Sequence, residues 1–437
     1  MKTVELDLFS RSTIAVTNTL NCPTVRTLPN GLTIVAEQMP IEAVNLNIYL
    51  NVGSFVETDG INGMAHFLEH MVFKGTSRLA AGEFERLVEA RGGVTNAATS
   101  QDYTHYYITT APKDFAALAP LQIDVVANPR IPDDDFAREK LVILEEIRRS
   151  HDSSSRRIYQ QAIEVAFAKL PYRRPVLGPE AAIEGITAQQ MRYFHATNYQ
   201  PTAMTAVAVG NLPVEELIDI ISDGFASQSG SIPTAEFVGR KAQPTPEPAF
   251  ARIVRKEHID PSLQQARLIM VWRVPGLTQL AETYPLDILA AILSSGRTSR
   301  LVKELREERQ LVNNISVSNM SNRIQGLFYL SAQLPSEHLA EVEQLITQHI
   351  FQLQTTLVTD AELSRIRRQV ANRYIFGTET PSDRADLYGY YRSVVGSLAP
   401  ALNYPQQIQA LDTPTIQLAA RHYLSPTAYG VITVKPA

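Results

Sequence analysis

Two short segments of the chain recur in the same order, and this repetition constrains the fold more than any other feature of the sequence. Pro201-Thr202-Ala203 follows a helical pattern and leads into an apolar run, and Pro426-Thr427-Ala428 does the same about half the chain length later. Gly75 ends one helical pattern, and Gly296 stands further on at almost the same separation. One short match could arise by chance, but two at nearly the same offset predict a duplicated α+β unit.

The segment Ser231–Pro248 divides the two predicted units. It carries four prolines among polar residues and shows neither helical nor strand periodicity. We therefore predict an N-terminal extension over residues 1–24, a first domain over 25–230, a linker over 231–248 and a second domain over 249–437. The 437 residues suffice for two domains that each bury a core.

The composition excludes several classes of protein. The net charge is −5 and no basic block occurs, which argues against nucleic acid or an anionic membrane as a partner. Cys22 is the one cysteine, so neither a disulfide framework nor a cysteine-rich metal site is expected. No run approaches the ~20 apolar residues that cross a bilayer, and Met1–Pro23 lacks the regions of a signal peptide. A soluble, cytoplasmic protein is therefore predicted.

Residue periodicity places three segments that matter for the chemistry. Apolar residues recur every three or four positions over Ile61–Phe73, which predicts a helix. Asn96–Thr110 alternates and is expected to form one strand. Asp133–Ser150 begins with acidic and ends with basic residues, the order that the helix dipole favours, so a long helix is expected there.

The segment His66-Phe67-Leu68-Glu69-His70 carries the clearest chemical signal. On a helix, His66 and His70 lie on one face, where two imidazoles can bind one tetrahedral metal such as Zn²⁺. Glu69 can then reach a water at the open position of the metal and take its proton, as in metallopeptidases with this residue order. The alternative is a solvated helix face with two histidines and an acid, and the motif alone leaves both interpretations open.

A catalytic zinc site needs a third protein ligand. The helix expected over Asp133–Ser150 offers Glu139, Glu145 and Glu146. Glu139 and Glu146 are seven residues apart and share a face, whereas Glu145 points about 100° away from Glu146.

With these residues the sequence resembles the M16, or pitrilysin-like, family of zinc metallopeptidases. In that family H-x-x-E-H is followed by a glutamate ligand far downstream, at the separation that Glu146 has from His70 in this chain. The resemblance implies three zinc ligands, His66, His70 and Glu146. It also implies that Glu69 is the general base and that Glu139, seven residues before the last ligand, supports the site.

A second match concerns the substrate. Gly92–Thr99 resembles the family segment GG-x-x-NA-x-T, whose strand edge accepts the substrate backbone. The resemblance implies substrate contacts by Asn96, Ala97, Thr99 and, from the second half, Arg306. The family places a tyrosine seven residues after that arginine, but Asn313 stands there in this chain. Either the substitution is harmless, or a second subunit supplies the complete pair of arginine and tyrosine.

The resemblance also implies an α+β fold with two duplicated halves, each with an antiparallel-rich sheet packed by helices, that face each other around a chamber. The metal site is expected in the first half alone. The expected function is that of a zinc-dependent metalloendopeptidase that hydrolyses peptides or unfolded segments, as a homodimer or as a heterodimer with a second M16-like subunit. The alternative is a non-catalytic or partner-dependent subunit of a processing complex.

Overall fold

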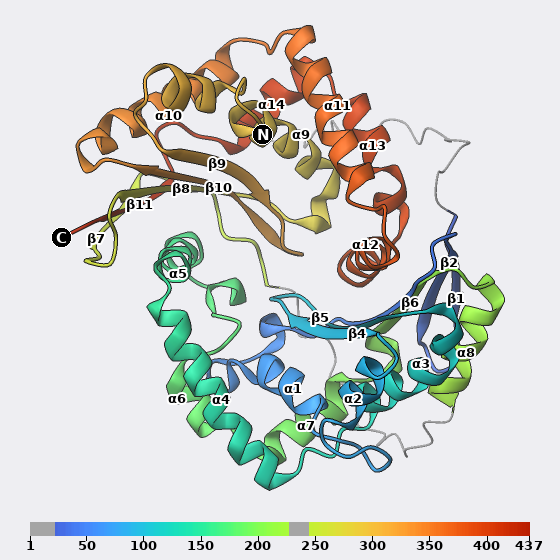
Figure 1. The fold of residues 1–437 in the computed structure, drawn as a ribbon. Helices are drawn as coiled ribbons and strands as arrows, with labels where there is room; N and C mark the ends of the chain where they lie inside the picture. Colours follow the sequence, from blue (N-terminus) through green and yellow to red (C-terminus); the bar gives the residue numbers. More distant parts are fainter. Residues whose placement is uncertain (1–21, 227–243) are drawn as a thin grey trace, which may run out of the picture.

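The computed structural model describes residues 22–226 and 244–437, which form two β-sheets with their helices (Figure 1). The first sheet has the strand order β1-β2-β6-β3-β5-β4, and the second has the order β7-β11-β8-β10-β9. The strands of the first sheet are β1 (Thr24–Thr27), β2 (Thr33–Gln38), β3 (Val44–Leu50), β4 (Val94–Thr99), β5 (Thr104–Thr110) and β6 (Met204–Gly210). Those of the second sheet are β7 (Val254–Ile259), β8 (Ala266–Pro275), β9 (Asn314–Met320), β10 (Gln325–Leu334) and β11 (Gly430–Lys435).

Helices cover the outer face of each sheet and separate the two sheets (Figure 1). The helices of the first half are α1 (Met64–Val72), α2 (Glu83–Glu89), α3 (Pro112–Ala127), α4 (Asp133–Asp152), α5 (Ser154–Ala166), α6 (Glu180–Gly185), α7 (Ala188–Asn198) and α8 (Val214–Ala226). Those of the second half are α9 (Leu280–Ser294), α10 (Leu339–Thr355), α11 (Asp360–Phe376), α12 (Pro381–Val394), α13 (Ala399–Ala410) and α14 (Thr413–Tyr423). A π-helical segment, η6 (Val302–Glu308), precedes β9.

The two sheets repeat one topology, which confirms the predicted duplication. Strands β2-β6-β3-β5-β4 correspond in order to β7-β11-β8-β10-β9, and the parallel pair β2 and β6 corresponds to the parallel pair β7 and β11. The first residues of these strands, Thr33 of β2 and Val254 of β7, are as far apart along the chain as Gly75 and Gly296, and we call this separation the repeat offset. Gly75 and Gly296 follow α1 and α9 with φ of 99° and 85°, a backbone conformation that glycine adopts at little cost. The α+β fold with two similar halves is therefore the one predicted.

Each half covers the inner face of its sheet with a helix from the other half. Helix α12 of the second half lies on the first sheet, where Ala385 and Tyr388 pack in one buried cluster with Val207 of β6 (Figure 1). Helix α5 of the first half lies on the second sheet, where Ile163 packs in one cluster with Ile432 of β11. Strands β3 and β6 are consequently buried along their whole length, because both faces of the sheet are covered there.

Polar groups and one glycine fix the position of α12 on the first sheet. Tyr388 Oη donates a hydrogen bond to Glu37 of β2 at 2.7 Å, and Arg384 Nη1 donates one at 3.1 Å. A Cβ at Gly389 would lie 2.2 Å from the ring of Tyr49 on β3. The helix therefore approaches the strand so closely that only a glycine fits at this point.

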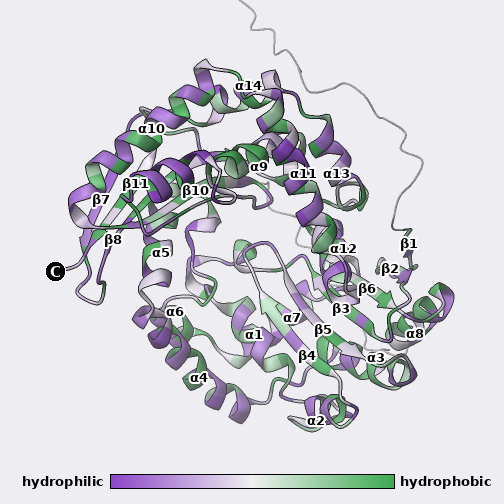
Figure 2. Ribbon diagram, turned by 45° about the horizontal axis from the view of Figure 1, so that its top comes forward, coloured by the Kyte–Doolittle hydropathy of each residue, from purple (hydrophilic) through white to green (hydrophobic). Residues whose placement is uncertain are grey.

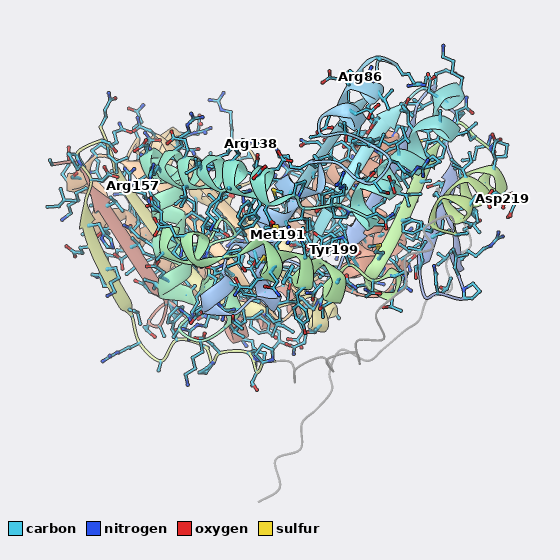
Figure 3. All side chains as sticks on the ribbon, turned by 90° about the horizontal axis from the view of Figure 1, so that it is seen from below. Arg86, Arg138, Arg157, Met191, Tyr199 and Asp219 are labelled. Atoms are coloured by element: carbon cyan, nitrogen blue, oxygen red, sulfur yellow. The ribbon has the colours of Figure 1, made fainter. Side chains whose placement is uncertain are left out.

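Hydropathy follows this arrangement. Helix α9 is hydrophobic along its length, whereas α4 is largely hydrophilic and lies at the surface (Figure 2). Seen from the helices of the first half, Met191 and Tyr199 lie near the centre, and Arg86 and Asp219 lie at the periphery (Figure 3). Met191 of α7 and Tyr199, which directly follows this helix, are buried in the core cluster that also contains residues of α1.

The single strand predicted over Asn96–Thr110 is wrong. The segment forms the hairpin of β4 and β5, with Ser100 N donating to Tyr103 O at 2.8 Å across the turn. The turn residue Asp102 accepts a hydrogen bond from Arg323 N of the second half at 2.8 Å. This contact joins the turn to the other half of the chain. The alternation of polar and apolar residues therefore could not predict the turn.

The predicted domain boundaries stay predictions. Residues 1–21, to which the expectation about a signal peptide refers, and residues 227–243, which hold most of the expected linker, lie outside the described part of the chain. Residues 244–248 form neither helix nor strand. Across the two described ranges, no helix combines the length and the apolar character needed to cross a membrane.

The close approach of α12 predicts a stability difference between two glycine variants. Gly389→Ala should lower the free energy of unfolding by about 1–3 kcal/mol, because the methyl group must displace the ring of Tyr49 or the helix. Gly185→Ala, at the end of α6 with open space around the position, should stay within about 0.5 kcal/mol of the parent. Urea denaturation of both variants measures this, and equal midpoints would contradict the packing described for α12.

Candidate metal centre

Helix α1, which carries His66, Glu69 and His70, begins at a buried carboxylate. Glu57 accepts hydrogen bonds from the backbone nitrogens of Gly63 and Ala65, each at 2.8 Å. Donors in a first helical turn lack intrahelical acceptors, so Glu57 satisfies them and determines where the helix starts. Burial raises the pKa of Glu57 to about 7, although these hydrogen bonds act in the opposite direction.

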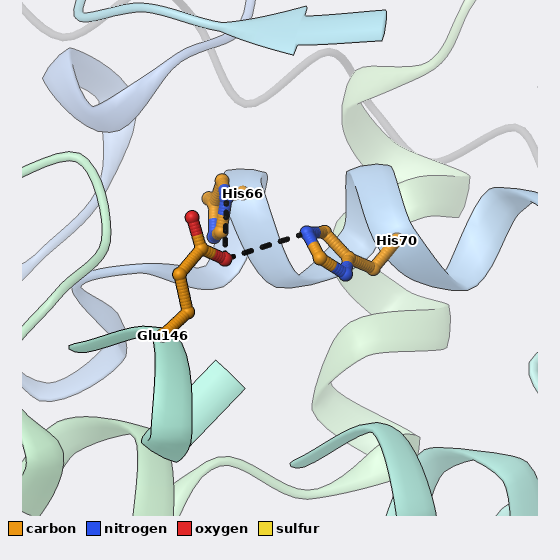
Figure 4. Close-up of side chains that lie close together, drawn as sticks. All are labelled: His66, His70 and Glu146. Carbon is orange, nitrogen blue, oxygen red and sulfur yellow. Dashed lines mark ion pairs between the residues drawn. The ribbon is translucent and has the colours of Figure 1, made fainter. Parts of the chain in front are cut away.

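The three predicted ligands converge between α1 and α4 (Figure 4). The Nε2 atoms of His66 and His70 each lie 3.7 Å from Glu146 Oε2, and ligand atoms of the three residues lie within 4.8 Å of one another. Ligand atoms bound to one tetrahedral Zn²⁺ lie about 3.4 Å apart, given bond lengths near 2.0–2.1 Å. The donor set and its spacing therefore fit a zinc ion.

Glu139 holds the ring of His70 from the side opposite Glu146. Glu139 Oε1 is hydrogen-bonded to His70 Nδ1 at 2.9 Å, which leaves Nε2 facing Glu146. The other oxygen of Glu139 pairs with Lys74 Nζ at 2.7 Å. A carboxylate on the remote nitrogen of a ligating histidine selects its tautomer and orientation. These contacts place Glu139 beside His70, and its supporting role at a metal site stays a prediction.

Glu69 faces β4 and not the ligand carboxylate. Thr99 Oγ1 donates a hydrogen bond to Glu69 Oε2 at 2.5 Å. Burial raises the pKa of Glu69, and the hydrogen bond from Thr99 and the charge of His70 oppose this shift. The carboxylate is therefore a better proton acceptor than a solvated glutamate, while one of its oxygens is held in place.

The pKa values of the two histidines shift in opposite directions. Burial and, to a smaller extent, the charge of the nearby His70 together lower the pKa of His66 to about 3, so His66 is neutral and can donate its lone pair. Burial also acts to lower the pKa of His70, but its hydrogen bond to Glu139 and the charges of Glu139, Glu69 and Glu146 outweigh this effect and raise the pKa. His66 Nδ1 is buried and has no hydrogen-bond partner in the part of the chain that the structure describes.

A cavity of about 1390 Å³ opens onto these side chains. His66, Glu69 and Glu146 line it together with residues 97–99 of β4, parts of α4 and α5, and residues 172–180. Strand β4 pairs with β5 on one side and is the edge of its sheet, so its other side is free for hydrogen bonds. Of the predicted substrate contacts, Ala97 and Thr99 line the cavity, and the exposed Asn96 accepts a hydrogen bond from Ala97 N at 2.9 Å.

The predicted contact from the second half lies elsewhere. Arg306, on η6, pairs with the adjacent Glu307 at 2.7 Å and does not line the cavity. Asn313 is exposed and donates its backbone N–H to Gln333 O at 2.8 Å. The substrate contact of Arg306 therefore stays a prediction.

Two comparisons within the chain support the choice of ligands. Glu145 pairs with Arg149 on the outer side of α4 at 3.2 Å, as expected from its angle on the helix. In the second half, the positions that correspond to the motif at the repeat offset hold Asp287, Ala290 and Ala291 on α9. Among the described residues, His66, His70 and Glu146 are the group whose ligand atoms lie close enough to share a metal ion.

Sequence reasoning missed Lys74 and Glu57. Lys74 follows His70 by four residues, a spacing that places both on one side of the helix end, and this spacing could have indicated a shared partner. Nothing in the sequence around Glu57 shows that its carboxylate turns back to the start of α1, because a short 3₁₀ helix over Asp59–Ile61 and loop residues join the two, and no periodicity predicts their course.

The sequence and the structure resemble known proteins along most of the chain. Residues 33–180 match the family described as "Insulinase (Peptidase family M16)", and residues 185–370 match the "Peptidase M16 inactive domain". An uncharacterised zinc protease of Streptomyces coelicolor is 30% identical over 81% of this chain and 76% of its own length. A probable mitochondrial-processing peptidase subunit beta of Arabidopsis thaliana is 25% identical over 94% of this chain and 78% of its own. The crystal structure of a protease from Helicobacter pylori superposes with a TM-score of 0.87 at 26% identity, covering 95% of this chain and all of that one.

The ligand geometry predicts opposite outcomes for two neighbouring glutamates. Glu146→Gln should weaken zinc binding by more than the ~10–100-fold typical of residues that only support a ligand, because one ligand loses its charge. Glu145→Gln should bind zinc as the parent does, because its side chain points away from both histidines. Competition with a fluorescent chelator measures both affinities, and undiminished zinc binding by the Glu146 variant would rule out this ligand.

Proposed function

The chain belongs to the M16 family of peptidases, and on this premise we propose that it is a zinc-dependent endopeptidase acting on peptides or unfolded segments. The observation that carries the proposal is the convergence of His66, His70 and Glu146 with Glu69 beside them. A bound zinc ion would polarise the scissile carbonyl and lower the pKa of a water molecule. The residues of the chain supply the remaining steps.

Glu69 is proposed as the general base. Its carboxylate lines the cavity next to two of the ligands, and burial raises its pKa, which makes it a stronger proton acceptor. It takes a proton from the attacking water and later gives one to the nitrogen of the leaving amine, so the carboxylate is regenerated. The hydrogen bond from Thr99 holds one oxygen and leaves the other for this transfer.

The free edge of β4 is proposed to bind the substrate backbone. An extended peptide can add to an edge strand by main-chain hydrogen bonds, which accept many side chains. The peptide would lie along Asn96–Thr99, with its backbone beside the metal centre. A folded protein presents no free extended segment of this kind, so peptides and unfolded chains are the expected substrates.

A non-catalytic subunit is the second candidate. Residues 185–370, which span the end of the first half and much of the second, match a domain described as inactive. In the second half, Asp287, Ala290 and Ala291 supply no metal-binding set. The first half, however, keeps both histidines, Glu146 and Glu69 in a compact arrangement. Retention of the complete set favours the enzyme.

A dimeric assembly is also part of the proposal, either of two identical chains or with a second M16-like subunit. One relative is named as a subunit of the mitochondrial processing peptidase, which by this name has more than one subunit. Asn313 stands where the resemblance leads us to expect tyrosine, and Arg306 is engaged with Glu307. A partner with both side chains could complete the substrate contacts.

If Glu69 is the general base, a variant without its carboxylate should bind zinc but hydrolyse peptides very slowly. Glu69→Gln should keep the fold and the metal and lose at least about 10²-fold in kcat, because only the proton acceptor is removed. Glu145→Gln should retain parental activity and serves as the control. Hydrolysis of a quenched unstructured peptide, with zinc content measured in parallel, tests this, and parental turnover by the Glu69 variant would exclude it as the base.

The departure at position 313 predicts a gain of function. Asn313→Tyr should raise kcat/KM of the isolated chain about two- to tenfold, the scale of one added hydrogen bond to the substrate. The isolated chain is assayed with and without this substitution and with and without an added M16-like subunit. If neither change increases its activity, no partner is required.

A further inference from the structure

One wall of the cavity at the metal centre carries an arginine without a counter-charge, which bears on the choice of substrate. Helix α5 forms this wall, with Arg156 near its start and Glu164 two turns further along. The wall continues into α4, because Glu146 and Ser150 line the same cavity. The cavity therefore extends from the metal centre to the first turn of α5.

Three other arginines of the cavity already have carboxylate partners. Arg157 donates to Asp260 Oδ2 at 2.5 Å. Arg173 and Arg174 both pair with Asp59, at 2.9 and 2.7 Å. One carboxylate thus pairs with both guanidinium groups.

Arg156 differs from these three residues. Its side chain is exposed, and it forms no ion pair with any residue in the described ranges. The backbone nitrogen of Arg156 donates a hydrogen bond to the Ser153 hydroxyl at 3.5 Å. This bond does not involve the guanidinium group, which can therefore bind a ligand.

The carboxylates of the cavity are less available to a ligand. Asp59 is shared by two arginines, Glu69 accepts from Thr99, and Glu146 faces two imidazoles. Glu164 accepts a hydrogen bond from the Gln160 amide at 3.1 Å and is the competing site for a basic side chain. Glu180 also lines the cavity and pairs with Arg148 at 3.6 Å. Arg156 is therefore the guanidinium group of the cavity that has no carboxylate partner among the described residues, and it can bind an anion.

We infer that Arg156 binds an acidic side chain of the substrate, so that the enzyme prefers peptides with Asp or Glu close to the cleaved bond. The inference rests on the proposed peptidase function and specifies its substrate class. A carboxylate can accept two parallel hydrogen bonds from one guanidinium group, which makes the recognition directional. A lysine or arginine at the same place would face Arg156 with a like charge.

The test uses peptides that differ at one residue. Quenched peptides carry Glu, Gln or Lys at each position flanking the cleaved bond in turn, and kcat/KM is measured for the zinc-loaded parent, Arg156→Glu and Arg149→Glu. Arg149 lies on α4, is 77% exposed and does not line the cavity, so its variant changes the net charge equally. At one position the parent should prefer Glu over Gln about five- to tenfold, and high salt should weaken this preference.

The variants decide the outcome. Arg156→Glu should lose the preference for Glu and favour Lys at the same position, whereas Arg149→Glu should keep the parental order. Equal rates for all three peptides, a parental preference for Lys, or the same loss in both variants would overturn the inference.

Binding separates this inference from the proposed function. The affinities of the Glu and Lys peptides are measured by fluorescence anisotropy with zinc-loaded Glu69→Gln, alone and combined with Arg156→Glu. If no peptide is cleaved by the parent but the Glu peptide binds more tightly in an Arg156-dependent way, the peptidase proposal fails and the recognition of acidic peptides stands. If cleavage occurs and neither rate nor affinity depends on Arg156, only the present inference fails.

Discussion

Each half of the molecule buries the inner face of its sheet under a helix from the other half, and the rest of the structure depends on this exchange. Without α12, apolar side chains such as Val207 and Val209 would face solvent, at a cost of about 25 cal/mol for each Å² exposed. Without α5, Ile432 and Val434 would do the same. The exchange also shapes the cavity, because α5 is both the cover of the second sheet and the wall beside the metal centre.

The metal centre depends on burial combined with specific partners for three carboxylates. Burial keeps His66 neutral, so that a metal does not compete with a proton there. Glu139 pairs with Lys74 and orients His70, Glu69 is held by Thr99, and Glu146 alone faces both imidazoles. Three glutamate side chains thus have three different environments, and their proposed roles differ accordingly.

The second half shows that the fold persists where these donors are replaced. Asp287, at the position that corresponds to His66, accepts hydrogen bonds from Asn319 Nδ2 at 2.9 Å and Tyr404 Oη at 2.7 Å. Burial raises its pKa to about 6. Ala290 and Ala291 are buried in the core of that half. The corresponding helix therefore packs as an ordinary core helix, and chemistry in this architecture depends on the side chains and not on the topology.

The sequence by itself determined the duplication, the helix of the motif and the different helix faces of Glu145 and Glu146. These follow from spacing along the chain or around one helix, which the regular geometry of a helix converts directly into a face. Only the tertiary structure decided the turn between β4 and β5, the pairing of Lys74 with Glu139 and the exchange of α5 and α12. The physical reason is that these features join residues from different elements, such as Tyr49 of the first half and Asp386 of the second. Local periodicity indicates which face of an element is apolar, but the element that covers this face depends on the packing of the whole chain.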